Sequence, residues 1–393
     1  MRLSFIVTSF DILPYVDPCL TSLAAVVRPG DRVILVDDGS TDGTAERIEA
    51  WQARGFGAGV GVKAVLLGTN TMGGVGIGGN IGLSEALSDP DCEGVFFVDG
   101  DDWLEPGGFA AARLAFERGG ADILLGNYGE YDDQTQGFRR PADAARWGHV
   151  ARLGKTAGPQ SAAQTEAARD LALSMIAVPW RKFYRADFLR RHGLRFPEGA
   201  FFFEDNPFHW AVCLAAGRIG FLDVILCQHR INRPGQTMAS TGAELIAFFD
   251  HYETITALVT AQETARAEAA LDWLLNNMSW HLDRLAPEAF WAYAGRAAEV
   301  LTRVPEPLWQ GSARRFSRRP VGGIAAALRR GDVAGVVGVW VQQAEARALH
   351  ARLEEMDPRA LLARLDNRLQ AEAEIARFAA LSALSLPALP PLP

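Results

Sequence analysis

Cysteines are few in this chain, long apolar runs are absent, and positive charge is not in excess. The four cysteines are scattered without a CxxC pair, which favours a reducing compartment where thiols act as small core residues. No run of about eighteen uninterrupted apolar residues occurs, so no membrane-spanning helix is expected. The formal net charge of −8 argues against a nucleic-acid partner, which would favour a basic surface. Polar residues within the first apolar stretch indicate a strand rather than a signal peptide.

The first half of the sequence alternates strand-like and helix-like segments. Short apolar runs predict strands near 3–9, 32–37, 62–68, 94–99 and 121–126. Helical periodicity predicts helices near 16–27, 43–54, 80–88 and 106–119. This alternation indicates an α/β fold with a Rossmann-type, mostly parallel sheet that is flanked by helices.

The chain is long enough for two domains, and its composition changes near residue 240. Its 393 residues are 49% hydrophobic, which is sufficient for a sizeable core. Residues 128–175 are polar and irregular. A helix pattern follows near 186–192 and a strand pattern near 219–228. Beyond residue 240, Ala, Leu, Arg and Glu dominate with helical periodicity. We therefore expect one domain over 1–240 and a mainly α-helical C-terminal domain over 241–393.

Carboxylates gather at the ends of two predicted strands. The apolar run 95–98 ends in Asp99, Asp101 and Asp102, and Asp37 and Asp38 follow the run 32–36. Like charges repel, so such clusters indicate either a divalent cation, which prefers oxygen ligands, or a solvated acidic turn. Ligands of open parallel sheets bind beyond the carboxyl ends of the strands. Both acidic ends are therefore expected to face one crevice.

Together these two segments resemble the motifs of a known enzyme family. Val-Asp-Asp-Gly-Ser-Thr-Asp at 36–42 and Phe-Val-Asp-Gly-Asp-Asp-Trp at 97–103 are similar to the nucleotide-binding and DxD motifs of family 2 glycosyltransferases. The resemblance covers about residues 1–240 and implies a GT-A-like fold. It also implies that Asp101, with Asp99, holds Mn²⁺ or Mg²⁺ on the donor diphosphate. Asp102 is expected to be a structural cap or a residue that supports the metal ligands from behind.

The resemblance also implies a set of residues that hold the donor nucleotide. Asp38 would read the uracil or ribose, and the alternative is that Asp37 and Asp38 only build an Asx turn with Gly39; agreement of the whole motif favours the nucleotide role. The first strand end would hold the nucleobase, where the family usually has Tyr-Asn. The donor-binding residues expected on this basis are Thr8, Phe10, Asp11, Asp37, Asp38, Gly74, Asn80, Asp99 and Gly100.

Catalytic and acceptor residues are implied further along the chain. The family places its general base in a Glu-Asp pair, usually on the Asp, and Glu204 and Asp205 match this pair. The alternative is that these carboxylates cap a helix. Trp180 and Lys182 match the family's Trp-x-Lys, with core packing as the alternative. A basic loop with His229 and Arg230 either closes over the diphosphate or is a solvated loop. These last four residues are the candidates for acceptor or diphosphate contacts.

The glycine-rich segment 74–79 allows a different interpretation. Gly74, Gly76 and Gly79 satisfy GxGxxG, and Asp99 lies about twenty residues on, as in a dinucleotide fingerprint. A NAD-dependent oxidoreductase is therefore one alternative. The family pattern at this place is instead matched by Asn70, Gly73, Gly74, Asn80 and Gly82. It is broken at Gly79, where the family usually has Arg, so a non-catalytic sugar-nucleotide-binding protein is a second alternative.

The resemblance thus implies a metal-dependent glycosyltransferase. It would move a sugar from a UDP-sugar to a glycan or lipid-linked acceptor with inversion, in cell-surface polysaccharide synthesis. We expect the protein in the cytoplasm. A basic cluster predicts either peripheral contact with the inner face of the plasma membrane or a solvated helical face. This cluster consists of Arg314, Arg315, Arg318, Arg319, Arg329 and Arg330.

Overall fold

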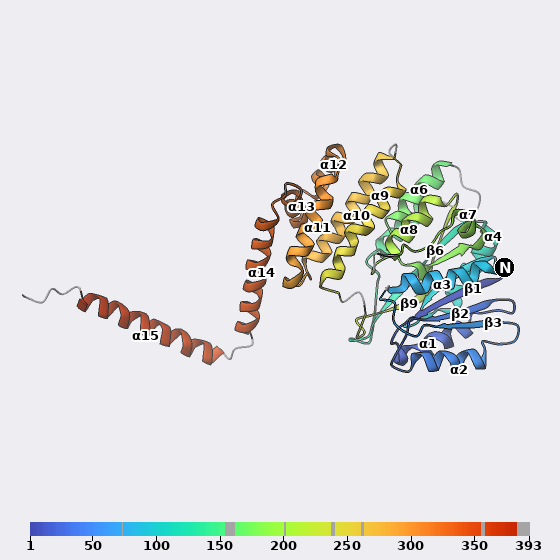
Figure 1. Cartoon of the computed structure of the whole chain (residues 1–393), viewed down its shortest axis with the longest axis horizontal. Coiled ribbons are helices and arrows are strands. Elements are labelled where there is room, and N and C mark those ends of the chain that lie inside the picture. The colour runs from blue at the N-terminus through green and yellow to red at the C-terminus, as the bar shows by residue number, and fades with distance from the viewer. Residues whose placement is uncertain are drawn as a thin grey trace, which may run out of the picture. The chain divides into compact units, whose positions relative to one another are not determined.

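The computed structural model describes residues 1–72, 74–153, 162–199, 202–236, 240–260, 263–354 and 358–382 (Figure 1). Gly73 of the family pattern lies outside these residues. The strands are β1 (Leu3–Ser9), β2 (Arg32–Asp37), β3 (Gly61–Leu66), β4 (Gly94–Asp99), β5 (Trp103–Leu104), β6 (Ile123–Asp132), β7 (Gly137–Arg139), β8 (Lys182–Arg185) and β9 (Ile219–Ile231). The predicted strands near 3–9, 32–37 and 94–99 are confirmed.

Helices connect these strands and make up the rest of the described chain. In the first part they are α1 (Leu13–Ala24), α2 (Thr44–Arg54), α3 (Gly74–Ser88), α4 (Pro106–Gly119), α5 (Trp147–Val150), α6 (Ala162–Leu173), α7 (Ala186–His192) and α8 (Asp205–Ala215). The later helices are α9 (Ala247–Leu258), α10 (Thr264–Leu282), α11 (Phe290–Arg303), α12 (Glu306–Phe316), α13 (Pro320–Arg329), α14 (Val333–Glu354) and α15 (Pro358–Ser382). The helical character predicted beyond residue 240 is thus confirmed.

The strands form one mixed sheet with the order β3-β2-β1-β4-β8-β6-β9-β5, and β7 pairs with β6. β1, β2, β3 and β4 are mutually parallel, as the alternating pattern predicted. β8 lies antiparallel between β4 and β6, so it separates two groups of parallel strands. The sequence pattern did not reveal this insertion, because β8 is short and comes late in the chain.

Neighbouring residues of a strand point to opposite faces of the sheet, and in this protein both faces are buried. On β4, Phe96 packs against Phe109 of α4 with ring centroids 5.0 Å apart. The adjacent Phe97 packs on the other face against Phe196 and Phe208, with centroids 5.5 and 6.0 Å apart. Aromatic clusters on both faces therefore hold the strand that carries Asp99 at its end.

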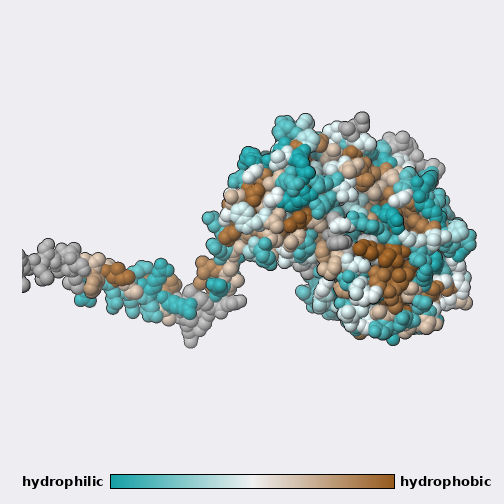
Figure 2. Space-filling model, in the orientation of Figure 1, coloured by the Kyte–Doolittle hydropathy of each residue, from teal (hydrophilic) through white to brown (hydrophobic). Residues whose placement is uncertain are grey.

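Helix α3 is unusual because it is rich in glycine yet regular. A Cβ atom at Gly82 would lie 2.2 Å from Cγ2 of Ile6 on β1, and one at Gly78 would lie 3.4 Å from Cγ2 of Thr8. The glycines therefore allow the helix to approach the sheet closely. Figure 2 shows a hydrophobic area on the face where α3 lies, and Met72 and Val75 at its start are exposed.

The chain divides into two compact units, Met1–Gly331 and Asp332–Pro393. The first unit contains the sheet together with α9–α13, and α8, α9 and α10 run side by side within it (Figure 1). The boundary expected at residue 240 lies inside this first unit, between β9 and α9. The second unit contains α14 and α15.

Candidate active site

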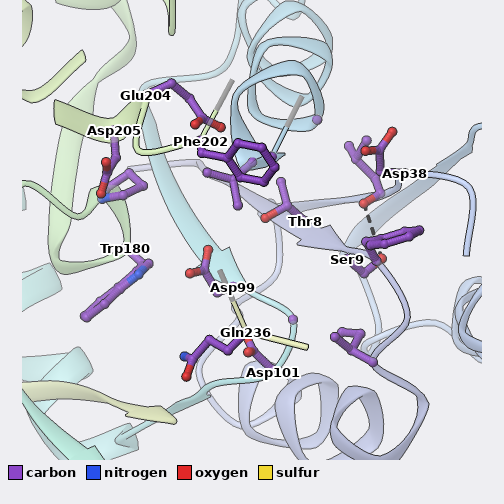
Figure 3. Close-up of a pocket in the computed structure, with 18 of the residues that line it drawn as sticks. Thr8, Ser9, Asp38, Asp99, Asp101, Trp180, Phe202, Glu204, Asp205 and Gln236 are labelled. Carbon is purple, nitrogen blue, oxygen red and sulfur yellow. Dashed lines mark hydrogen bonds between the residues drawn. The ribbon is translucent and has the colours of Figure 1, made fainter. Parts of the chain in front are cut away.

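A cavity of about 410 Å³ opens where the carboxyl ends of β1, β2 and β4 meet. The strand register places Thr8 beside Val36 of β2 and beside Asp99 of β4. A crevice at this edge is the usual ligand site of an open α/β sheet. Figure 3 shows Asp38 on one side of the cavity, Glu204 and Asp205 on the other, and Asp99 between them.

Most of the residues predicted from sequence line this cavity. They are Thr8, Phe10, Asp38, Gly74, Asp99, Gly100, Asp101, Trp180, Glu204, Asp205 and His229. Further lining residues that the sequence analysis did not select include Ser9, Asn70, Phe202, Phe203, Arg233 and Gln236. The basic loop that contains Arg233 was visible in the sequence, whereas nothing in the sequence distinguishes Gln236.

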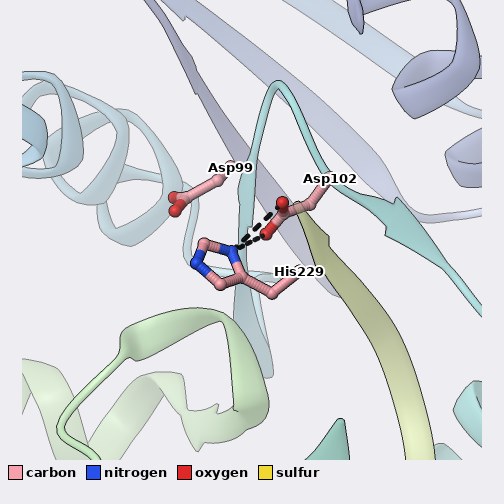
Figure 4. A group of neighbouring side chains, drawn as sticks. All are labelled: Asp99, Asp102 and His229. Atoms are coloured by element: carbon pink, nitrogen blue, oxygen red, sulfur yellow. Dashed lines mark hydrogen bonds and ion pairs between the residues drawn. The ribbon is translucent and has the colours of Figure 1, made fainter. Parts of the chain in front are cut away.

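Two aspartates and one histidine lie close together at the cavity, of which Asp99 and His229 line it and Asp102 lies behind them (Figure 4). Ligand atoms of Asp99, Asp102 and His229 lie within 4.8 Å of one another, which is close enough to share a metal ion. Burial, together with the charges of neighbouring aspartates, raises the pKa of Asp99 well above its ordinary value. No described residue donates a hydrogen bond to the Asp99 carboxylate. A half-buried carboxylate in this state fits a cation ligand.

Asp102 and His229 form a hydrogen-bonded pair within this group. Nδ1 of His229 lies 2.9 Å from Oδ2 of Asp102, and the backbone N–H of Arg230 donates to Oδ1 at 2.8 Å. Burial opposes a charge on the imidazole, but the Asp102 carboxylate outweighs it and raises the pKa of His229 to about 9. The ring of Trp180 stacks on His229 with centroids 4.8 Å apart. Asp102 therefore does more than cap a turn, because it orients this histidine.

Asp101, the predicted main metal ligand, is engaged by a cation of the protein itself. Its carboxylate pairs with the guanidinium of Arg233, which also lines the cavity. Arg230 lies outside the cavity, stacks over Tyr15 at 4.6 Å and donates from Nε to the carbonyl oxygen of Asp101. Arg233 is thus the arginine of this loop that faces the cavity.

At the opposite end, two adjacent aspartates have different surroundings. Asp37 is fully buried, and its carboxylate accepts hydrogen bonds from the hydroxyls of Ser9 and Ser40 at 2.9 and 2.6 Å. Asp38 lines the cavity and accepts from the backbone N–H and the hydroxyl of Thr71 at 3.1 and 3.0 Å. Burial raises the pKa of Asp38. Asp37 therefore holds the turn, and Asp38 is presented to the cavity.

Glu204 and Asp205 differ in a similar way. Glu204 is buried, and its Oε1 accepts the backbone N–H of Gly76 at 2.5 Å, so it caps the start of α3. A Cβ atom at Gly74 would lie 2.7 Å from this oxygen, which explains why glycine is needed here. Burial raises the pKa of Glu204 to about 7. Asp205 begins α8, lines the cavity and is half-buried, and burial also raises its pKa.

Backbone strain is concentrated around the cavity. Among the described non-glycine residues, positive φ angles occur at Asp11, Met72, Gln136, Phe202, Phe203 and Asn232. Met72, Phe202 and Phe203 line the cavity. Left-handed conformations of bulky residues are costly and persist only where surrounding contacts impose them. Phe202 and Phe203 are two consecutive residues of this kind, directly before Glu204. Contacts with neighbouring residues must therefore fix the conformation of the turn at 202–204.

Five other predicted residues lie outside the cavity. Asp11 accepts the backbone N–H of Thr41 at 2.8 Å and so links two turns. Lys182 is fully buried and donates from Nζ to the carbonyl oxygens of Ala177 and Val178, and burial lowers its pKa to about 7. Together with Asp37 and Arg230, described above, they support the walls, and a ligand contact by any of them stays a prediction. The fifth such residue, Asn80, belongs to α3.

The structure explains the departure at Gly79. A Cβ atom there would lie 2.8 Å from Cε2 of Phe196, so this ring occupies the space of a larger side chain. The adjacent Asn80 donates to the carbonyl oxygen of Phe196 at 3.0 Å and accepts its N–H at 2.9 Å. The glycines of 74–79 follow β3 and lie within α3, not in a loop after the first strand as in a dinucleotide fingerprint. The oxidoreductase alternative therefore loses its support.

The basic cluster of the helical region is partly neutralised within the protein. Arg315 pairs with Glu268 and Asp272 at 2.9 and 2.6 Å, and Arg329 pairs with Glu306 at 3.0 Å. These contacts favour a solvated helical face over a membrane contact. In the described part of the chain, no helix combines the length and apolar character needed to cross a bilayer.

The mixed sheet and the acidic cavity at the ends of β1, β2 and β4 define a GT-A-like fold of the nucleotide-sugar transferase class. Residues 4–191 match the model of the family described as Glycosyl transferase family 2. Through this domain the chain belongs to glycosyltransferase family 2, as the sequence motifs indicated.

Relatives and solved structures agree with this assignment. The chain is 26% identical over 261 residues to EpsJ of Bacillus subtilis, described as an uncharacterized glycosyltransferase, covering 63% of this chain and 70% of that protein. It is 26% identical over 245 residues to the poly(ribitol-phosphate) β-N-acetylglucosaminyltransferase TarS of Staphylococcus aureus, covering 61% of this chain and 37% of TarS. The structure of TarS residues 1–349 with UDP-GlcNAc matches with a TM-score of 0.65 at 23% identity, covering 87% of this chain and 92% of that one.

Proposed function

We propose that the protein transfers a sugar from a UDP-sugar to a hydroxyl of a glycan or lipid-linked acceptor, with inversion at the anomeric carbon. The observation that carries this proposal is the arrangement of three groups around one cavity (Figure 3). Asp38 lies at one end, Asp99 and His229 lie at the centre, and Asp205 lies at the other end. Nucleotide, diphosphate and acceptor sites would follow in this order.

The nucleotide end offers both stacking and hydrogen bonding. Phe10 is 43% exposed at the cavity, which leaves a ring face free for a base. Asp38 is held by Thr71 and Asn70, so its carboxylate is fixed before a ligand arrives. A carboxylate suits the N–H of uracil or the hydroxyls of ribose. UDP-GlcNAc is the first donor to test, because a structure of TarS, which shares the fold, was solved with it.

The centre of the cavity would hold Mn²⁺ or Mg²⁺ through Asp99, with Asp102 and His229 as the closest further ligands. Such an ion supplies Lewis-acid stabilisation of the charge on the departing diphosphate. Arg233 is the protein's own cation at this place, and we propose that it exchanges Asp101 for the diphosphate when the donor binds. Asp101 would then become available to the ion, as the DxD resemblance implies.

At the acceptor end, Asp205 would serve as the general base. Both carboxylates line the cavity, but Glu204 is buried and hydrogen-bonded to the start of α3, whereas Asp205 is half-buried. A single displacement needs one carboxylate near the acceptor hydroxyl, on the side opposite the leaving group. Trp180 lines the cavity beside this site, but its ring is buried and stacks on His229, so its role is to hold that histidine. We place the reaction on the cytoplasmic side, in the synthesis of a cell-surface polysaccharide.

The proposal is tested by calorimetric titration of UDP with and without Mn²⁺. We expect Mn²⁺ to increase the affinity for UDP in the wild type, and Asp99→Ala and Asp101→Ala to remove most of this increase. Asp170→Ala, an exposed residue of α6, is the matched control and should bind as the wild type does. A Mn²⁺ effect that survives both substitutions would contradict the cation site. Absence of any UDP binding by the wild type would contradict the proposed donor class.

A further inference from the structure

Asn206, directly after the proposed base, connects it to a helix of the C-terminal region. The Nδ2 atom of Asn206 donates to Oδ1 of Asp205 and to the carbonyl oxygen of Phe203, both at 2.9 Å. Its Oδ1 atom accepts the indole N–H of Trp273 at 3.2 Å. Trp273 lies on α10, which supplies no residue of the cavity lining. A continuous chain of hydrogen bonds thus runs from α10 to the carboxylate.

The chemistry of the two ends determines the orientation of the amide. An indole N–H can only donate, and an ionised carboxylate can only accept. The observed orientation of Asn206 satisfies both partners. The reversed amide would place its oxygen against Asp205 and the carbonyl oxygen of Phe203, and its NH₂ group against the indole N–H, which loses all three bonds and creates repulsions at each partner. Asp205, Phe203 and Trp273 therefore favour the same amide orientation, and Trp273 holds Asn206 from the oxygen side of the amide.

We infer that Trp273 and Asn206 are positioning residues, which hold the Asp205 carboxylate in the orientation needed to accept the acceptor's proton. This inference rests on the proposed role of Asp205 as the base. It places part of the catalytic arrangement in α10, beyond residue 240, although every residue that lines the cavity precedes that position.

The turn that carries Asp205 is held from the same side by further contacts. The ring of Phe203 packs on Phe248 of α9 with centroids 4.6 Å apart. Nε2 of His251, also on α9, lies 2.7 Å from the carbonyl oxygen of Phe202. These contacts account for the left-handed backbone at Phe202 and Phe203, since strained residues persist only where neighbours impose them. We call the hydrogen-bonded chain from Trp273 through Asn206 to Asp205 the relay. It acts on a turn whose backbone is already held by these other contacts.

The charges around Asp205 determine how the hydrogen bond from Asn206 affects the pKa of this carboxylate. Burial raises the pKa of Asp205, while Lys182 of β8 and the hydrogen bonds at Asn206 lower it. The other titratable groups that interact with Asp205 are Glu204, Asp99 of β4 and Tyr184 of β8. Loss of the Asn206 bond removes one of the few contacts that favour the ionised form. The base would then become active only at higher pH.

The variant Trp273→Phe tests the relay, because it removes the indole N–H and keeps an aromatic ring. Trp280→Phe is the matched control: Trp280 lies on the same helix, and its ring packs on Phe203 with centroids 6.2 Å apart. Two readouts are used on the full chain. One is the ¹³C titration of the Asp205 carboxyl, assigned by its absence in Asp205→Asn. The other is the pH profile of UDP release from UDP-GlcNAc with Mn²⁺.

We expect Trp273→Phe to raise the titration midpoint of Asp205 by about one pH unit, and to move the acidic limb of the profile equally. Trp280→Phe should leave both unchanged, and both variants should bind UDP as the wild type does. A wild-type midpoint in Trp273→Phe, or an equal shift in Trp280→Phe, would overturn the relay. If Asp205→Asn releases UDP at the wild-type rate, the proposed base itself fails. If that variant is inactive while Trp273→Phe is unchanged, only the relay fails.

Discussion

At the scale of single residues, carboxylates that are adjacent in sequence have separate tasks. Asp37 holds a turn while Asp38 lines the cavity, and Glu204, which also lines the cavity, caps α3 while Asp205 is half-buried beside it. Their neighbours, not their type, decide these roles, because burial and hydrogen bonding determine which carboxylate stays available. Each acidic pair therefore contains one residue that supports the backbone and one that we propose to contact the ligands.

Asp205→Asn separates the role of base from that of helix residue. The substitution keeps the size of the side chain, and no side chain caps the start of α8, so we expect near-normal stability and UDP affinity. Transfer should fall by about a hundred- to ten-thousand-fold, since the general base is lost. Steady-state rates of sugar transfer and a thermal melt provide the check. Asp170→Asn is the exposed control, and a wild-type rate in Asp205→Asn would contradict the role of Asp205 as the base.

Glu204→Gln should change how stability depends on pH. Burial raises the pKa of Glu204 from its ordinary value of about 4.3 to about 7, so the folded state disfavours the charged form. In the wild type this group therefore lowers the free energy of unfolding as pH rises from about 4.3 to about 7. Gln can still accept the N–H of Gly76 and carries no charge. The variant should gain roughly 3 kcal/mol relative to wild type between pH 4 and pH 8.

Urea unfolding at the two pH values, followed by tryptophan fluorescence, measures this difference. A constant difference between variant and wild type across the range would show that Glu204 is not a buried acid of raised pKa. A loss of stability at both pH values would instead indicate that the amide cannot replace the carboxylate at Gly76.

At the scale of elements, α3 shows how packing overrides local preference. Glycine disfavours helix because it loses much conformational freedom on folding. The glycines of α3 nevertheless lie in a helix. Glycine is needed there because larger residues would collide with Ile6, Phe196 or Glu204. The close approach brings the start of α3 to the cavity, where Glu204 caps it. The same packing excludes the arginine that the family usually has at Gly79.

Two glycine-to-alanine substitutions with opposite expected effects test this interpretation. Gly82→Ala should destabilise the protein by about 1–3 kcal/mol, because its Cβ would meet Ile6 at 2.2 Å. Gly323→Ala, in α13, meets no atom within 4 Å and should stabilise by roughly 0.5–1 kcal/mol. Chemical unfolding of both variants measures the two differences. Equal effects at the two positions would mean that α3 can move away from β1 without cost.

At the scale of the whole molecule, the active site depends on more than the sheet. Although all lining residues precede residue 240, α9 and α10 hold the turn at 202–206 through Phe248, His251 and Trp273. The compact unit that contains the site accordingly extends to Gly331. The helices up to α13 are thus part of the framework of the enzyme.

Two truncated chains separate these contributions. A chain that ends at Gly331 keeps the whole first unit, and we expect it to bind UDP-GlcNAc with Mn²⁺ as the full chain does. A chain that ends at Gly242 loses α9 and α10, so Phe202 and Phe203 lose their support and donor affinity should fall at least tenfold, about 1.4 kcal/mol. Calorimetry on both chains, after circular dichroism confirms folding, gives the comparison. Equal affinity in the shorter chain would show that the turn holds itself.

The sequence by itself determined the α/β framework and the position of its acidic strand ends. Apolar runs such as 95–98 bury a strand wherever they occur, and a carboxylate that follows at once must lie at its end. These are local properties, so strands near 3–9, 32–37 and 94–99 and the cavity residues Asp38 and Asp99 could be predicted.

Only the tertiary structure decided which partner each of these groups has. Arg233 lies beside Asp101 and His229 beside Asp102, although more than a hundred residues separate them in the chain. Trp273 reaches the turn at Asn206 across 67 residues. Such pairs depend on how the elements pack, and side-chain periodicity contains no information about contacts between distant segments. The physical reason is that burial acts locally on each strand and helix, whereas partner choice is a property of the assembled core.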